Sequence, residues 1–240
     1  MSWLTGRHAI EAAIDRGTQG RLIVVKGASG SSDVARLARR AGIQPEYRDG
    51  QWLRRHVGGA ARSFAFEIDD RESSPVVHLK DWLTRGEPEA SNLVLCLDHI
   101  QDPHNYGAIL RTADLFGVGL VVVPAKRTVG QTDVVMRTSA GASAYVPVAI
   151  ERNLNRSIAS LKEHGYWVYA ADMGGKPVSS VTFPKNTAIV VGAEGKGIAQ
   201  HTRRLCDEIV AIPTVGHVES LNVSVATGVL TYEFRRQHTS

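Results

Sequence analysis

Residues 93–123 read LVLCLDHIQDPHNYGAILRTADLFGVGLVVV. Two continuous apolar runs, 93–97 and 120–123, enclose an amphipathic stretch at 106–116, and this order predicts strand, helix, strand. Strands that are apolar on both faces are typical of a parallel sheet covered by helices on both sides. Such sheets bind ligands beyond the carboxyl ends of their strands, so we expect functional residues in the segment 98–113.

The same alternation of strand and helix continues to residue 236. It predicts an α/β domain with a mostly parallel sheet over 92–240. The further elements that we expect are helices at 134–138, 154–164, 198–205 and 221–236, and strands at 146–150, 167–171, 188–191 and 209–212.

Residues 1–69 read as a separate, small α/β domain, with a helix at 7–16, a strand at 22–26 and a helix at 33–40. Polar, proline-containing stretches follow on both sides of a short helical pattern at 77–83. Such composition is typical of the segments that join domains, and we therefore interpret 70–91 as a linker.

Composition and length indicate an ordinary folded protein. The chain has 240 residues, of which 43% are hydrophobic and 22% charged, as in soluble globular domains. No apolar run approaches the roughly 18 residues of a membrane span, so we expect a cytoplasmic protein. Cys96 and Cys206 are far apart in apolar segments, which predicts two buried thiols and no metal site.

The positive charge is confined to the first domain. The net charge is +4 and the pI is near 9.2. Residues 1–69 contain 11 Lys and Arg against 7 Asp and Glu, whereas 70–240 contain 17 of each. The chain has 21 Arg and 7 Lys, and arginine suits phosphate and base contacts, although a GC-rich genome would produce the same bias. An anionic partner such as RNA is therefore one interpretation of the first domain.

The common phosphate-binding motifs are absent. No G-x-G-x-x-G follows a strand, and residues 192–197, GAEGKG, lack the spacing and the Ser or Thr of a P-loop. A dinucleotide dehydrogenase and a P-loop NTPase are therefore disfavoured. No H-x-x-H or H-E-x-x-H grouping is present, so we expect no metal.

Individual polar residues at the strand ends have simple structural explanations. Asn105 has the chemistry of an N-cap for the helix that carries Arg111, and Asp114 could pair with Arg111 at i+3. Ser220 is a plausible N-cap for the last helix, with Asn222 just inside it. The apolar positions of that helix predict a buried stripe of Leu221, Val225, Val229 and Leu230.

Taken together, three segments resemble the three motifs of the SpoU (TrmH-like) family. Its members are RNA ribose 2′-O-methyltransferases of the SPOUT superfamily. The matching segments are NYGAILRTA at 105–113, VGAEGKG at 191–197, and IP at 212–213 followed by ESLNVSVA at 219–226. Three long motifs in the family's order make this resemblance specific over about 92–237.

The resemblance implies a fold, a cofactor and a set of site residues. The implied fold has a deep C-terminal trefoil knot that binds S-adenosylmethionine without a metal, in a homodimer with shared active sites. The implied cofactor contacts are Gly192, Ile212 and Leu221. The implied catalytic set is Asn105, Arg111, Glu194, Ser220 and Asn222. For Arg111 two roles stay open, as the base that takes the 2′-hydroxyl proton or as a cation that stabilises phosphate and developing alkoxide.

Residues 1–69, which begin with a GRHAI segment at 6–10, resemble the ribosomal-protein-like substrate-binding domain of many members. This resemblance points to the branch that methylates the ribose of a guanosine in 23S rRNA. The chain departs from that branch at 57–63, where VGGAARS replaces the usual His-Gln-Gly. Methylation of a tRNA D-loop guanosine, methylation of an rRNA adenosine, and a non-catalytic RNA-binding or assembly factor remain the alternatives.

Overall fold

The computed structural model divides the chain into two compact units. The first unit comprises Met1–Pro75 with Gly130–Tyr145, and the second comprises Val76–Val129 with Val146–Ser240. The structure describes residues 2–15, 17–58, 61–68, 76–84, 92–125, 133–193, 195, 197–218 and 220–239.

The first unit is a small α/β fold. Its described elements are β1 (Ser2–Leu4), α1 (Arg7–Asp15), β2 (Gly20–Val25), α2 (Ser31–Arg40), β3 (Glu46–Arg48), α3 (Gly50–His56), β4 (Phe64–Ile68), α6 (Asp133–Thr138) and the 3-10 turn η1 (Ala142–Ala144). The strands are ordered β1-β4-β2-β3, with β4 antiparallel to β1 and β2, and β3 parallel to β2. Helix α6 belongs to this unit because Met136 joins the core formed by α1, α2 and the sheet.

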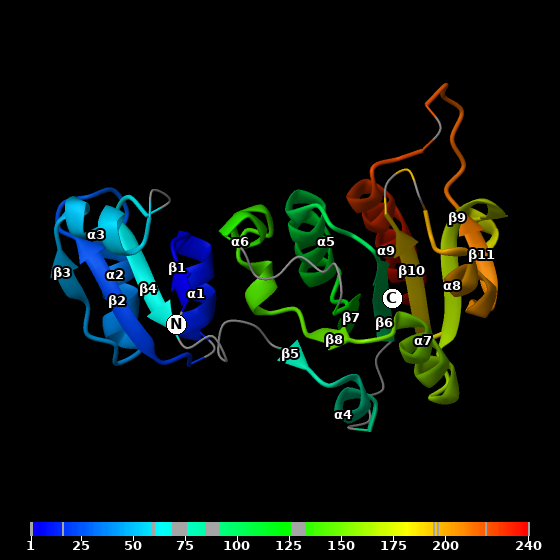
Figure 1. Cartoon of the computed structure of the whole chain (residues 1–240), viewed down its shortest axis with the longest axis horizontal. Helices are drawn as coiled ribbons and strands as arrows, with labels where there is room; N and C mark the ends of the chain where they lie inside the picture. The colour runs from blue at the N-terminus through cyan, green and yellow to red at the C-terminus, as the bar shows by residue number, and fades with distance from the viewer. Residues whose placement is uncertain are drawn as a thin grey trace. The chain divides into compact units, whose positions relative to one another are not determined.

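The second unit is built on a parallel sheet, as the sequence predicts (Figure 1). Its strands run β11-β9-β10-β6-β7-β8-β5, and every described pair is parallel. The strands are β5 (Val76–Val77), β6 (Asn92–Asp98), β7 (Leu120–Pro124), β8 (Val148–Glu151), β9 (Trp167–Pro177), β10 (Asn186–Gly192) and β11 (Glu208–Ala211). The helices are α4 (Leu79–Thr84), α5 (Pro103–Leu115), α7 (Leu154–Glu163), the 3-10 turn η2 (Val178–Ser180), α8 (Gln200–Leu205) and α9 (Val223–His238).

The strand order contains a switch point between β6 and β10. After β6 the chain moves to β7 and β8 on one side, whereas after β10 it moves past β9 to β11 on the other side. The connections therefore diverge at the carboxyl ends of β6 and β10, where such sheets form a ligand crevice. Asp98 and Gly192, the last residues of these strands, are partners in the register.

Strand alternation divides the buried residues between the two faces of the sheet. Val94 and Cys96 pack in a core with Leu79 of α4 and Ile158 of α7. Residues such as Leu95 point to the opposite face, because successive side chains in a strand alternate. Helices α5 and α9 lie side by side, and α9 also contacts β10 (Figure 1).

The second unit begins before the predicted end of the linker. Residues 76–84 form β5 and α4, and β5 pairs with β8 at the edge of the sheet. Leu79 and Trp82 of α4 are buried in the core. Cys96 and Cys206 are free, with Cys96 fully buried and Cys206 partly buried. No helix in the described ranges is long and apolar enough to cross a membrane.

The predicted buried stripe of the last helix is wrong. Leu230 is buried, but the side chains of Leu221, Val225 and Val229 are 39%, 52% and 38% exposed. The helix packs instead through Val223, Thr227, Leu230, Thr231 and Phe234. The Thr227 and Thr231 hydroxyls donate to carbonyls one turn earlier, so these threonines can be buried without an unpaired donor. An apolar face of α9 is left exposed as a result.

Candidate active site

A buried carboxylate joins the loops that follow β6 and β10. Asp98 is 2% exposed, and its Oδ2 accepts the Ala199 backbone N–H at 2.8 Å. Its Oδ1 lies 2.5 Å from Nδ1 of His99, whose backbone has a φ of 61°. These two bonds satisfy a carboxylate that would be costly to bury alone. Asp98 therefore fixes the end of the glycine-rich loop against β6.

The glycine-rich loop after β10 turns back on itself. Gly197 donates its N–H to the Ala193 carbonyl at 2.8 Å, and Gly195 and Gly197 have positive φ angles. A Cβ on Gly192 would lie 2.1 Å from the Gly197 carbonyl carbon, so only glycine fits there. The loop thus exposes backbone groups at the switch point. Glu194, a predicted catalytic residue, lies outside the described residues.

Helix α5 begins earlier than Asn105, which corrects the predicted cap. Asp102 is the N-cap, and its carboxylate accepts the N–H groups of His104 and Asn105. Pro103 follows at the first helical position, where its missing N–H costs nothing. Asn105 lies in the first turn and is buried, with 9% exposure. Burial also raises the pKa of the neighbouring Tyr106 hydroxyl.

Helix α9 begins after Asn222, so the predicted cap Ser220 is also wrong. The Asn222 Oδ1 accepts the Ser224 N–H at 2.9 Å and the Ser224 hydroxyl at 2.6 Å. The Asn222 Nδ2 donates to Oδ1 of Asn105 at 2.9 Å. Two residues that are 117 positions apart in the sequence thus meet where α5 and α9 begin. This amide pair is the structural centre of the candidate site.

Replacing Asn222 with alanine should damage both the helix and the site. We expect the free energy of unfolding to fall by about 1 kcal/mol, the usual cost of an N-cap. Activity should fall further than this loss of stability alone would cause, because the hydrogen-bond donor to Asn105 is also lost. The matched control is Asn153→Ala, which removes the N-cap of α7. Equal activity of the two variants, compared in thermal melting and turnover, would exclude Asn222 from the site.

Arg111 lies on α5, and no hydrogen bond joins it to the amide pair among the described residues. It lies six positions after Asn105, which is about 9 Å along a helix axis. Its side chain is exposed, and no ion pair joins it to Asp114 in the part of the chain that the structure describes. The simple explanation of Arg111 as a partner of Asp114 is therefore wrong. Partial burial raises the pKa of the Asp114 carboxyl.

The remaining predicted residues flank the loop between β11 and α9. Ile212 follows β11 directly and is partly buried, whereas Ser220 and Leu221 are exposed just before α9. Residues 212–218 project away from the sheet (Figure 1), and the side chains of Val215 and Val218 are almost fully exposed. Among the described residues, no hydrogen bond joins Ile212 or Ser220 to the amide pair. Within the same ranges, no group of three His, Cys, Asp or Glu could hold a metal.

Asp98, which binds the second loop, and His99 lie within the predicted segment 98–113, but neither was predicted individually as a site residue. A signal for Asp98 was available, since a carboxylate directly after a fully apolar strand needs a buried partner. Its partner, the Ala199 N–H, is 101 residues away and has no sequence signature.

The fold is that of solved methyltransferase structures. The chain superimposes with a TM-score of 0.80 on the crystal structure of the SpoU methyltransferase AviRb from Streptomyces viridochromogenes in complex with AdoMet. That match covers 99% of this chain and 90% of the other, at 22% identity, and shows a shared fold.

Residues 92–232 match the SpoU rRNA Methylase family, and the chain belongs to this family. It is 37% identical to the 23S rRNA (guanosine-2′-O-)-methyltransferase RlmB of Xylella fastidiosa, covering 99% of this chain and 97% of the relative. It is 36% identical to the protein of the same name from Neisseria meningitidis serogroup B, covering 97% and 94%. The family resemblance predicted from the motifs is confirmed, and the chain is a methyltransferase.

Proposed function

We propose that this chain transfers a methyl group from S-adenosylmethionine to the 2′-hydroxyl of a guanosine in 23S rRNA, in the cytoplasm. The observation that carries the proposal is the similarity to relatives named for this reaction, because it extends over the whole chain, including the first unit.

The glycine-rich loop suits the cofactor. Gly192 has no room for a side chain, and the loop presents backbone donors and acceptors at the switch point. We propose that Gly192, Ile212 and Leu221 hold the cofactor mainly through backbone atoms, inside a deep trefoil knot. The return of α9 to α5 after the chain has reached β11 at the sheet edge supports such threading. S-adenosylmethionine supplies a methyl carbon on a positively charged sulfur, which needs no metal to be electrophilic.

The chain's own residues then orient the ribose and handle one proton. The ribose oxygen forms a bond to the methyl carbon, the carbon–sulfur bond breaks with its electrons remaining on sulfur, and the hydroxyl proton leaves. Placing the oxygen in line with that bond is most of the catalytic work. We propose that Asn105, Ser220 and Asn222 orient the ribose, together with Glu194. Arg111 either takes the proton while its side chain is neutral, or stays charged and stabilises the developing alkoxide while the proton passes to water.

We propose that 1–69 is the RNA-binding domain, that 70–91, whose residues 76–84 pack on the second unit, joins it to the catalytic domain, and that 92–240 catalyses transfer. The excess positive charge of the chain lies in 1–69, which suits a phosphate backbone. Contacts of this kind release counterions, so RNA affinity should fall steeply with salt. The small domain also carries the ribosomal-protein-like resemblance.

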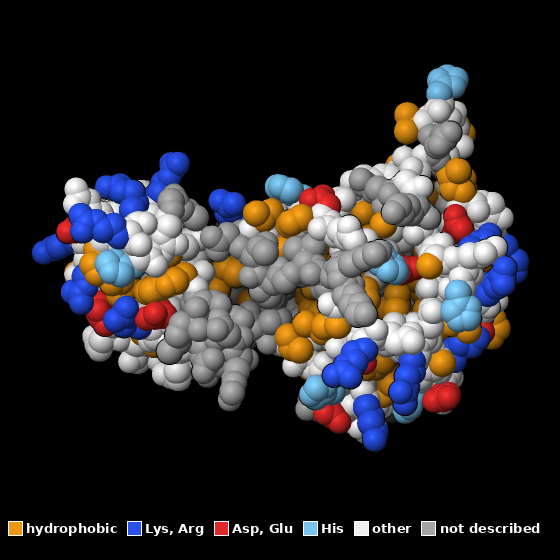
Figure 2. Space-filling model, in the orientation of Figure 1, with side chains coloured by type: hydrophobic (Ala, Val, Ile, Leu, Met, Phe, Trp, Pro, Cys, Tyr) orange, Lys and Arg blue, Asp and Glu red, His pale blue; other side chains and the backbone are white. Residues whose placement is uncertain are grey.

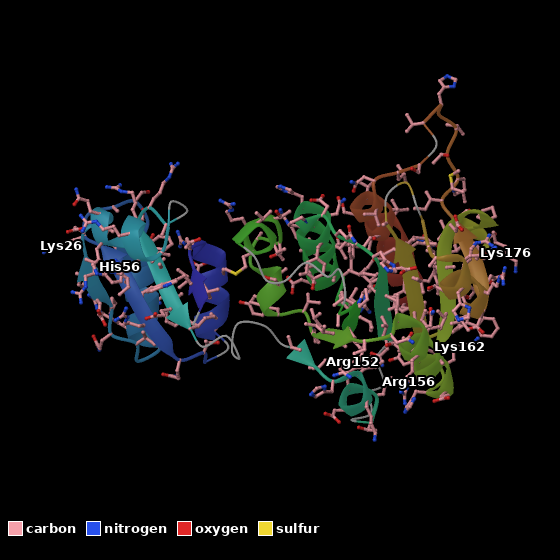
Figure 3. The ribbon with its side chains drawn as sticks, in the orientation of Figure 1. Lys26, His56, Arg152, Arg156, Lys162 and Lys176 are labelled. Atoms are coloured by element: carbon pink, nitrogen blue, oxygen red, sulfur yellow. The ribbon has the colours of Figure 1, made fainter. Side chains whose placement is uncertain are left out.

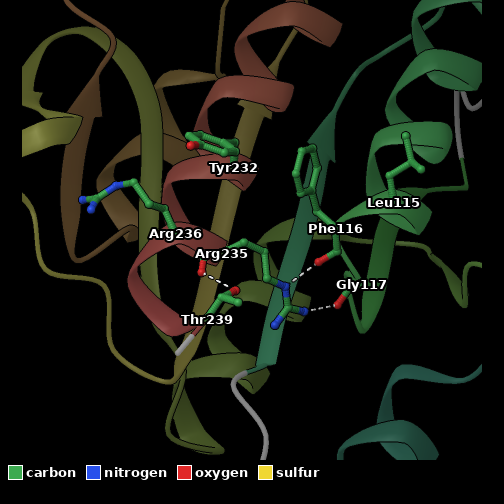
Figure 4. Close-up of a pocket in the computed structure, with 7 residues that line it drawn as sticks. All are labelled: Leu115, Phe116, Gly117, Tyr232, Arg235, Arg236 and Thr239. Atoms are coloured by element: carbon green, nitrogen blue, oxygen red, sulfur yellow. Dashed lines mark hydrogen bonds between the residues drawn. The ribbon is translucent and has the colours of Figure 1, made fainter.

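We further propose that the enzyme is a homodimer joined through the exposed apolar face of α9 and the end of α5. Leu115 and Tyr232 are 70% and 54% exposed and border a cavity of about 460 Å³ (Figure 4). Arg235 anchors the two helices there, since its guanidinium donates to the carbonyls of Phe116 and Gly117. Val225 and Val229 extend the same apolar face. Exposed apolar patches of this kind are typical of protein interfaces.

A charge on this face should separate the subunits. We expect Val229→Glu to convert the dimer into a monomer of 26.0 kDa, measured by light scattering after size exclusion. Met173→Glu is the control, because Met173 is also an exposed apolar residue of the second unit. A wild-type chain that is monomeric at micromolar concentration would contradict the dimer.

Labelled methyl transfer tests the function directly. The wild-type chain is incubated with labelled S-adenosylmethionine and total rRNA or total tRNA from cells lacking this gene, and the 2′-O-methylated nucleotide is mapped. Label on one guanosine of 23S rRNA is the expected result. Label only in tRNA would mean that the substrate is tRNA and not 23S rRNA. Absence of label from both, and from ribosome precursors, would contradict the proposed reaction.

A further inference from the structure

Helix α3 of the first unit carries a stacked pair of rings on its surface. Trp52 and His56 are one turn apart, with ring centroids 4.1 Å apart and planes at 13°. The backbone of Trp52 is fixed because its N–H donates to Asp49 Oδ1 at 2.7 Å. Trp3 meets the Trp52 ring edge-on, with centroids 6.4 Å apart. The rings therefore form a supported platform with His56 as its exposed end.

The orientation of the His56 ring is also determined. Its Nδ1 lies 2.9 Å from the Trp52 carbonyl oxygen. A carbonyl can only accept, so Nδ1 donates, which leaves Nε2 as the acceptor of the neutral ring. His56 thus offers a flat aromatic face and a polar edge. Figure 3 labels His56, and Figure 2 shows many Lys and Arg side chains, with some Asp and Glu, on this face of the first unit.

Cations surround the platform. The guanidinium carbons of Arg21 and Arg48 each lie 5.9 Å from the Trp52 ring centroid. Both arginines also pair with glutamates, Arg21 with Glu67 at 3.0 Å and Arg48 with Glu46 at 3.1 Å, so their charge is partly neutralised.

Other cations of the first unit are not neutralised in this way. Lys26, Arg54 and Arg62 form no ion pair in the described part of the chain. Lys26 and Tyr47 border a cavity of about 480 Å³ at the end of β2. The first unit thus carries both unpaired cations and an exposed aromatic stack. Single-stranded nucleic acid is bound by this combination, since cations track the phosphates and rings stack on the bases.

We propose that His56 and Trp52 form a stacking site for an unpaired nucleotide of the RNA substrate, with Arg21 and Arg48 supplying positive charge beside the Trp52 ring. This inference rests on the proposed function, and it assigns the first unit a preference for loops over duplexes. In a duplex the base faces are occupied by neighbouring pairs, whereas a loop can present an unstacked base. The excess of positive charge in 1–69 favours RNA over a protein partner.

The test compares two RNAs with the full-length protein. The first is a hairpin with 2-aminopurine in its loop, and the second is a blunt duplex of the same stem. We expect His56→Ala to weaken hairpin binding roughly tenfold, the order expected for one lost stacking contact. It should also abolish the fluorescence change of 2-aminopurine and leave duplex binding unchanged. His56→Phe keeps a ring at this position and should bind the hairpin nearly as the wild type does.

His164→Ala is the matched control. The His164 Nδ1 also lies against the carbonyl four residues earlier, at 2.8 Å from Ser160 O, but no ring contact of His164 is found among the described residues. An equal loss of hairpin and duplex binding in His56→Ala, or no loss beyond that of His164→Ala, would overturn the stacking site. A wild-type protein that methylates rRNA but binds the hairpin no better than the duplex would overturn the stacking site and leave the proposed function intact. Wild-type protein that neither methylates nor binds RNA would contradict the proposed function as well.

Discussion

The Arg111→Ala variant should lose methyl transfer and keep its affinity for S-adenosylmethionine. Removing one group that stabilises charge in a transition state costs roughly a hundred- to a thousandfold in rate. Arg111 is exposed on α5, whereas the proposed cofactor contacts lie on the loops after β10 and β11. Single-turnover transfer and calorimetric titration with S-adenosylmethionine measure the two quantities separately. Loss of cofactor binding would instead make Arg111 a structural residue.

Arg156→Ala is the control for this variant. Arg156 is likewise an exposed helical arginine of the second unit, on α7, and no ion pair involves it in the described ranges. Its removal should leave transfer unchanged. A comparable loss in both variants would mean that overall positive charge, and no specific position, supports the reaction.

Arg111→Lys separates the two roles that are open to this residue. A lysine side chain releases its proton about 2 to 3 pH units below an arginine side chain. If residue 111 takes the hydroxyl proton, the rate of the lysine variant should therefore rise with pH at a lower pH than in the wild type. If residue 111 stabilises phosphate or alkoxide, the pH profile should keep its shape and only its height should fall, because lysine lacks the planar fork.

The sequence was sufficient to predict six of the seven strands of the parallel sheet, all but β5, and the segments of the site. Apolar runs such as 93–97 mark strands that are buried on both faces, and this pattern depends only on local composition. The motif segments follow β6, β10 and β11, as predicted. The switch point follows from strand order, which local patterns do not contain. The contact between Asn105 and Asn222 depends on that order.

The errors concern choices between neighbouring residues and between faces of a helix. Asp102 and Asn105 can both cap a helix, and Pro103 decides between them. The last helix has apolar residues on more than one face, and packing against α5 and β10 buries Leu230 and Phe234 but not Val225. Met136 likewise packs in the core of the first unit with residues far away in the sequence, which periodicity does not reveal. Periodicity identifies an amphipathic helix, whereas its partner determines which side is buried.

Gly192→Ala should weaken cofactor binding strongly while the protein stays folded. The new Cβ would lie 2.1 Å from the Gly197 carbonyl carbon and 2.3 Å from the Ile198 nitrogen. Both are backbone atoms that cannot rotate away, so the loop after β10 must shift. A displacement of about 1 Å in a positioning element can cost on the order of a hundredfold. We expect a loss of that size in affinity for S-adenosylmethionine, measured by calorimetry.

The control for this loop variant is Gly50→Ala, because a Cβ there meets only the flexible end of Arg54 at 4.0 Å. Both variants should retain the circular dichroism of the wild type, and Gly50→Ala should also retain its cofactor affinity. Wild-type affinity in Gly192→Ala would show that the cofactor does not depend on the close approach of Gly192 to Gly197. The proposed site at the carboxyl ends of β6 and β10 would then lose its main structural support, since this close approach is what shapes the loop there.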